Sequence, residues 1–140
     1  MATVKHFEDL EVWQMARELC ADFHKICRVG EFAKDFDLRS QMRRSVGSSM
    51  DNIAEGFERN GKKEFVQFLS ISKGSIGEFR SQLYRALDNE YISKEQFEML
   101  FGKAQSISVK LNNFISYLTE SIYKGTKYKV KENPQTILNA

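Results

Sequence analysis

Apolar residues recur every three or four positions through four long segments of the chain. The first segment shows the pattern clearly between Val12 and Ile26, and this spacing is typical of an α-helix with one face in a core. The four segments cover approximately 10–26, 37–59, 62–87 and 93–118. Eleven phenylalanines and a single proline disfavour a disordered chain or a turn-rich β-fold. The sequence therefore predicts an all-α, antiparallel, up-down four-helix bundle.

The links between the segments carry helix-ending and helix-starting residues. Gly30 follows the first segment and can adopt the left-handed conformation that ends helices. Asn60-Gly61 breaks the pattern after the second segment, and Ser93 is an N-cap residue with Gln96 three positions later. Inside the third segment, Gly74 and Gly77 each cost about 1 kcal/mol relative to Ala, so we expect a tight helix crossing there.

A chain of 140 residues is long enough for one domain with one core. We expect this bundle domain to cover 1–123 and a flexible or partner-ordered tail to cover 124–140. The tail loses the helical period and carries four lysines, Lys124, Lys127, Lys129 and Lys131. Neither a signal peptide nor an apolar run of about 18 residues is recognisable, which predicts a cytoplasmic protein without membrane contact.

Residues that would support catalysis or metal binding are sparse. The helix spacing places Cys20 and Cys27 about 10 Å apart, too far for a disulfide, so we expect reduced core thiols. The two histidines, His6 and His24, do not occur in the Glu-x-x-His pairs of di-iron bundles, and we expect His24 at a surface or boundary. The sequence therefore predicts no enzyme, no metal and no cofactor.

A polar file runs along the second helix beside its apolar stripe. At 100° per residue, its members fall within about 60–80° of arc, and they are Gln41, Arg44, Ser48, Asn52, Glu55 and Arg59. A solvated face would give such a file without a function. The alternative is a hydrogen-bonded network at a helix or subunit boundary, with Arg44 and Glu55 paired within or between chains.

Basic residues gather around the same helix although the formal charge of the chain is only +2. The candidates for phosphate contacts are Arg39, Arg43, Arg44, Arg59, Lys62 and Lys63. Acidic residues such as Asp51 and Glu58 are interspersed, so a salt-bridged solvated surface is the competing interpretation. Repetition in a symmetric oligomer would strengthen a weak patch by avidity.

Three segments carry a resemblance to a known family. They are LEVWQMA at Leu10–Ala16, SQMRRSVGSSMDNIAEGFER at Ser40–Arg59 and KKEFVQFLSISKGSIGEF at Lys62–Phe79. The chain resembles the bacterial 23S rRNA-intervening-sequence proteins, a four-helix bundle family that includes accessory proteins of diversity-generating retroelements. The resemblance covers about residues 7–119, and the Asn-Ile-Ala-Glu-Gly segment is its most specific part.

The resemblance implies a homopentameric ring with suspected binding to RNA or DNA, or to a reverse transcriptase in the retroelement branch. Members of that branch are more basic, so the charge of +2 argues against the specialised role. Two departures from the family are Val29-Gly30-Glu31-Phe32 in place of a Phe-Pro pair, and Gly61 in place of Ser. We expect a non-enzymatic, homo-oligomeric scaffold that binds nucleic acid; the alternative is a protein adaptor without nucleic-acid affinity.

Overall fold

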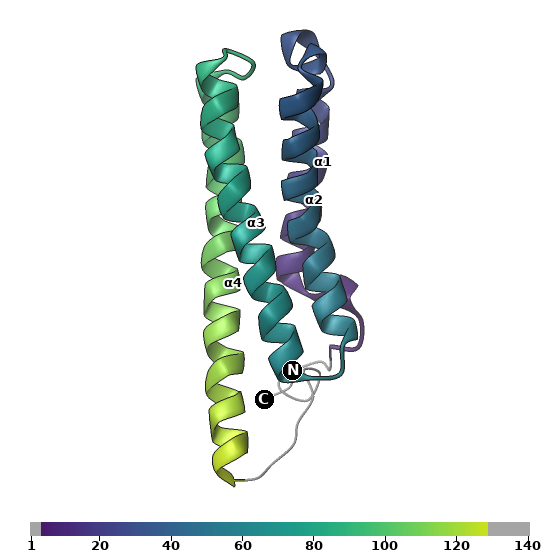
Figure 1. Ribbon diagram of the computed structural model, residues 1–140, viewed down its shortest axis with the longest axis vertical. Helices are drawn as coiled ribbons and strands as arrows, with labels where there is room; N and C mark the ends of the chain where they lie inside the picture. The colour runs from purple at the N-terminus through teal and green to yellow at the C-terminus, as the bar shows by residue number, and fades with distance from the viewer. Residues whose placement is uncertain (1–3, 129–140) are drawn as a thin grey trace.

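The computed structural model describes residues 4–128 and contains four long helices, each antiparallel to the next in the chain (Figure 1). The helices are α1 (Glu11–Cys27), α2 (Phe36–Glu58), α3 (Lys62–Asp88) and α4 (Lys94–Tyr128), with short 3-10 helices η1 (Phe7–Asp9) and η2 (Gly30–Lys34). Each helix packs against the next, and α1 also packs against α4. The predicted all-α up-down bundle is confirmed.

The predicted apolar faces form the core of the bundle. The predicted stripe on α2 is buried at all six positions, which are Leu38, Met42, Val46, Ser49, Ile53 and Phe57. Edge-to-face aromatic pairs connect the helices, with ring centroids 5.1 Å apart for Phe23 and Phe79 and 6.0 Å apart for Phe57 and Phe65. Such a pair contributes about 0.5–1.5 kcal/mol beyond its area burial.

The connection between α1 and α2 is a 3-10 helix held by aromatic and carboxylate contacts. Gly30 has a φ of +64°, which confirms the left-handed conformation expected of it. Phe32 is buried and stacks on Tyr91, with ring centroids 5.1 Å apart. Asp35 caps α2 by accepting from the Leu38 amide (3.0 Å) and also accepts from the Tyr91 hydroxyl (2.8 Å). These two hydrogen bonds, the backbone one first, hold the pKa of Asp35 below its ordinary value.

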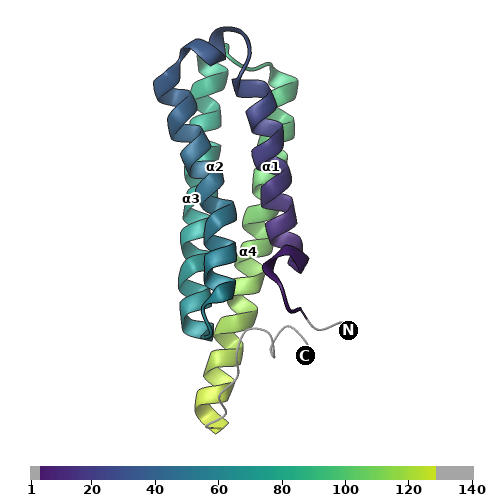
Figure 2. The same cartoon turned by 90° about the vertical axis from the view of Figure 1, so that its right-hand side faces the viewer.

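The start of α4 confirms the predicted capping box. The amide of Gln96 donates to Ser93 Oγ over 3.0 Å, and the Ser93 amide donates to Gln96 Oε1 over 2.9 Å. At its other end, α4 runs to Tyr128, past Tyr123 where the sequence placed the end of the bundle domain, and projects beyond the turn between α2 and α3 (Figure 2). The rest of the predicted tail, 129–140, lies outside the described residues.

The expectation of a tight crossing at Gly74 and Gly77 is wrong. A Cβ atom added at either position meets no atom within 4 Å. Gly74 lies about 200° around the helix from the buried Ser72, so it faces away from the core. Both glycines instead line a surface recess between α3 and α4.

α2 and α3 approach each other closely at Gly56 on α2. A Cβ atom there would sit 2.6 Å from Phe68 Cβ and 3.0 Å from Phe65 Cδ1 of α3. Real Cβ atoms essentially never show a contact as short as the first and seldom show one as short as the second, so glycine lets α2 and α3 pack as closely as they do. The glycine of the Asn52–Gly56 segment therefore has a packing role.

We predict opposite effects of one added methyl group at two glycines of α2. Gly56→Ala should lower the free energy of unfolding by roughly 1–3 kcal/mol, because it overpacks the α2–α3 contact. Gly47→Ala should raise it by about 0.5–1 kcal/mol, because its Cβ meets nothing within 4 Å and alanine favours the helix. Urea denaturation at one fixed protein concentration measures both. Equal effects of the two substitutions would contradict the assignment of the close approach to Gly56.

Candidate functional site

The predicted polar file lies along the seam between α2 and α3. Asn52 Nδ2 donates to the carbonyl and the hydroxyl of Ser48, over 2.8 and 2.9 Å, and Ser75 of α3 donates to the same hydroxyl over 3.0 Å. Nearer the amino end of α2, Arg85 of α3 donates to Gln41 Oε1 over 3.3 Å. Ser48, Asn52 and Gln41 are half-buried. This part of the file is a network between helices and not a freely solvated face.

Arg44 and Glu55 are not paired within the chain. They lie eleven residues apart on α2, which is about 16 Å along the helix axis. Glu55 instead pairs with Arg59, with 3.0 Å between Oε1 and Nη2. The pairing of Arg44 with Glu55 between chains stays a prediction.

A second polar layer between α2 and α3 contains four buried side chains, Ser45, Ser49, Ser72 and Gln82. Ser45 Oγ donates to Gln82 Oε1 over 2.6 Å, and Gln82 Nε2 donates to Glu78 over 3.1 Å. Ser72 Oγ donates to the carbonyl of Ser49 over 2.7 Å. Sequence reasoning missed Gln82, although its position three residues after the buried Phe79 places it on the core face.

The six candidate basic residues form two groups at opposite ends of α2. Arg39, Arg43 and Arg44 lie near its amino end, whereas Arg59, Lys62 and Lys63 lie at or just beyond its carboxyl end. Sixteen residues separate Arg43 from Arg59, which is about 24 Å of helix. They therefore do not form one continuous surface.

Lys62 does not fit the role of a phosphate contact. Only 8% of its surface is exposed, and its Nζ donates to Ser121 Oγ of α4 over 3.0 Å. Its position beside α4 makes it a structural residue. Arg59 is paired with Glu55, and its guanidinium also lies 5.1 Å from the ring centre of Phe68. Lys63 is exposed.

The three arginines at the amino end of α2 line one surface recess of about 780 Å³. Arg39 is anchored, because its Nη1 donates to the Ala33 carbonyl over 2.9 Å. Arg43 and Arg44 are exposed, and neither forms a hydrogen bond or an ion pair with another residue within 4–128. The recess also contains Phe36, Asp37 and Ser40. Sequence reasoning missed Phe36, whose place before the apolar stripe of α2 gave no signal of its exposure.

The surroundings of both thiols raise their pKa values. Cys20 Sγ donates to the Val46 carbonyl over 3.4 Å, and burial, with a smaller contribution from Asp51, raises the pKa of Cys20 to about 11. Burial also raises the pKa of Cys27 against the lowering effect of Arg43 and Arg39. Neither thiol is therefore a ready nucleophile at neutral pH. His24 is exposed, as expected.

The described part of the chain holds neither a metal-binding cluster nor a membrane-spanning helix. Residues 4–128 contain no cluster of three or more His, Cys, Asp or Glu side chains that is arranged to hold a metal ion. None of the helices in this part of the chain has the length and apolar character needed to cross a membrane.

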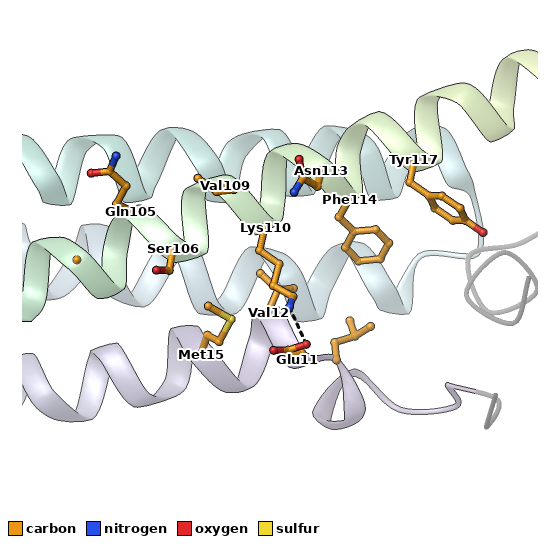
Figure 3. Close-up of a pocket in the computed structure, with 12 residues that line it drawn as sticks. Glu11, Val12, Met15, Gln105, Ser106, Val109, Lys110, Asn113, Phe114 and Tyr117 are labelled. Atoms are coloured by element: carbon orange, nitrogen blue, oxygen red, sulfur yellow. Dashed lines mark ion pairs between the residues drawn. The ribbon is translucent and has the colours of Figure 1, made fainter.

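A second, apolar recess of about 860 Å³ lies between α1 and α4 (Figure 3). Met15 on α1 and Phe114 on α4 are among its apolar lining residues, and Val109 on its α4 side is 56% exposed. An ion pair bridges the two helices, with 2.7 Å between Lys110 Nζ and Glu11 Oε2. We call this recess the α1–α4 groove; the sequence did not predict it.

Comparison with known proteins places the chain in a family. The family model described as 23S rRNA-intervening sequence protein matches residues 8–113. The chain belongs to this family. Its fold is similar to the crystal structure of a protein of unknown function from the S23 ribosomal protein family of Bacteroides thetaiotaomicron. The two are 24% identical with a TM-score of 0.70, over 75% of this chain and 95% of that one. The search of curated proteins found no match.

Proposed function

We propose that this family member is a non-catalytic, homo-oligomeric scaffold that binds nucleic acid through the arginines at the amino end of α2. The observation that carries the proposal is the exposure of Arg43 and Arg44 without carboxylate partners within 4–128. Guanidinium groups in this state are available to phosphate oxygens, which they bind in a bidentate manner. The recess holds three arginines against one carboxylate, Asp37.

The small net charge of the chain is compatible with this role. Several acidic side chains outside the recess form ion pairs. Lys103 Nζ, for example, lies 2.5 Å from Asp22 Oδ2 and 3.2 Å from Glu18 Oε1. The recess itself holds three arginines and one carboxylate, so positive charge is concentrated there although the total is only +2. An oligomer would present the recess several times, and simultaneous contacts to one strand would raise the overall affinity.

We also propose a cytoplasmic location, and the cysteines support both this and the non-catalytic role. The raised pKa values of Cys20 and Cys27 leave little thiolate for nucleophilic chemistry at neutral pH. Both cysteines are free, which is typical of proteins in a reducing compartment.

The α1–α4 groove supports the oligomeric part of the proposal. Val109, Tyr117 and Met99 of α4 are between 38% and 56% exposed and lie in or beside the groove. Apolar side chains gathered in a recess are typical of contacts between proteins. The family resemblance implies five subunits, and we propose that a second copy covers this groove in the ring.

Removing positive charge from the amino end of α2 should weaken RNA binding more than removing it from the carboxyl end. In the double variant Arg43→Gln/Arg44→Gln, the slope of log affinity against log salt should flatten by about 1.4, because each single-strand phosphate contact accounts for roughly 0.7. The matched control, Arg59→Gln/Lys63→Gln, removes two positive charges from the far end. Fluorescence anisotropy with labelled RNA over a salt series measures both slopes.

The proposal fails if the wild-type protein shows no affinity for RNA or DNA at physiological salt. Equal losses in the two double variants would also contradict it, because the charge would then act through the whole field of the protein and not through the recess.

The oligomer has its own test. Light scattering after size exclusion should give a salt-stable mass of about 80 kDa, five times the 16.3 kDa of one chain. Val109→Glu should shift the mass toward one chain by placing a charge in the groove. Val29→Glu, a control at a 60% exposed valine outside the groove, should leave the mass unchanged. A monomeric wild type, or an unchanged mass for Val109→Glu, would contradict this assignment.

A further inference from the structure

Phe36 presents an aromatic ring to solvent at the first residue of α2. The side chain is 70% exposed, so its apolar area contributes little to the core. The guanidinium of Arg39 lies over the ring, 4.8 Å from its centre. A cation in this position restrains the ring and leaves its other face open.

The ring and the free arginines lie on the same side of the helix. Positions three, four, seven and eight residues after Phe36 share its face of α2, and they hold Arg39, Ser40, Arg43 and Arg44. Arg43 lies about 10 Å from Phe36 along the helix axis. An aromatic platform and two phosphate-binding groups thus follow one another over the length of a few nucleotides.

We infer that this recess selects single-stranded nucleic acid, with a splayed base stacked on Phe36 and the adjoining phosphates on Arg43 and Arg44. The inference rests on the proposed function and narrows its ligand class. Stacking on an aromatic side chain requires the open face of a base, which a duplex hides between neighbouring base pairs. Because every base has such a face, the recess favours single strands without reading a particular sequence.

In this arrangement the affinity for nucleic acid has two contributions, attraction of phosphates by the arginines and stacking of a base on Phe36. A surface with basic residues alone would have only the first. The arginines attract phosphates in single strands and duplexes alike, and this attraction weakens as salt rises. The ring of Phe36 contributes only with a base that has left the stack, and its contribution does not depend on counterion release. Removing the ring should therefore change affinity without changing the salt slope.

The test compares Phe36→Leu, which keeps apolar bulk without an aromatic face, with Phe36→Tyr, which keeps the ring. Fluorescence anisotropy measures the affinity of each for a labelled oligouridine and for a blunt RNA duplex of equal length. Phe36→Leu should lose about tenfold in affinity for the single strand and keep its salt slope and its duplex affinity. Phe36→Tyr should retain wild-type affinity for the single strand.

Two binding results would overturn the inference without affecting the proposed function. One is a Phe36→Leu protein that binds oligouridine as tightly as the wild type while Arg43→Gln/Arg44→Gln does not. The other is a loss of affinity in Phe36→Leu that is equal for oligouridine and duplex. A change in the oligomer mass of Phe36→Leu would assign the ring to a subunit contact and also overturn it. If the wild type binds neither RNA, the proposed function itself fails.

Discussion

The close approach of α2 and α3 at Gly56 is the constraint on which the rest of the bundle depends. With a hydrogen in place of a side chain, Gly56 lets α2 approach the backbone that carries Phe65 and Phe68. That approach brings the hydroxyls of Ser48 and Ser75 within 3.0 Å of each other farther along the seam. It also fixes the rotation of α2, since a helix held at Gly56 and bonded at Ser48 cannot turn about its axis. The exposed direction of Arg43 and Arg44 follows from that rotation.

The periodicity of the apolar residues predicted the fold because it identifies the face of each helix that is buried. The buried faces, the turn at Asn60-Gly61 and the capping box at Ser93 are all local consequences of residue type and spacing. The glycines show the limit of this reasoning. A glycine inside a helix has the same conformational cost wherever it points, so Gly74 suggested a crossing that the structure places at Gly56.

The candidate site was harder to predict because residues of one charged region of the sequence can lie far apart along a long helix. Arg43 and Lys62 belong to one charged region of the sequence but lie at opposite ends of α2, and the contact of Lys62 with Ser121 depends on how α4 packs. The exposure of Phe36 likewise depends on the path of η2, which turns the chain so that Phe32 enters the core and Phe36 does not. The family resemblance identified the Asn52–Gly56 segment, and the structure supplies a physical reason for its glycine.

The two surfaces described lie toward opposite ends of the bundle. The α1–α4 groove includes the first residues of α1, whereas the arginine recess follows the turn after the last residues of α1. Contacts between subunits at the groove would therefore leave the recess of each subunit accessible. In the proposed function, this separation would let one small chain assemble and bind a strand without competition between the two contacts.

Photocrosslinking tests the location of the nucleic-acid interface most directly. The wild-type protein would be irradiated with single-stranded RNA that carries thiouridine, and the cross-linked peptides would be identified by mass spectrometry at low and high salt. Cross-links should fall within Phe36–Arg44 at low salt and decline as salt rises. Cross-links confined to the region of Arg59 and Lys63, or none at all under either condition, would contradict an interface at the amino end of α2.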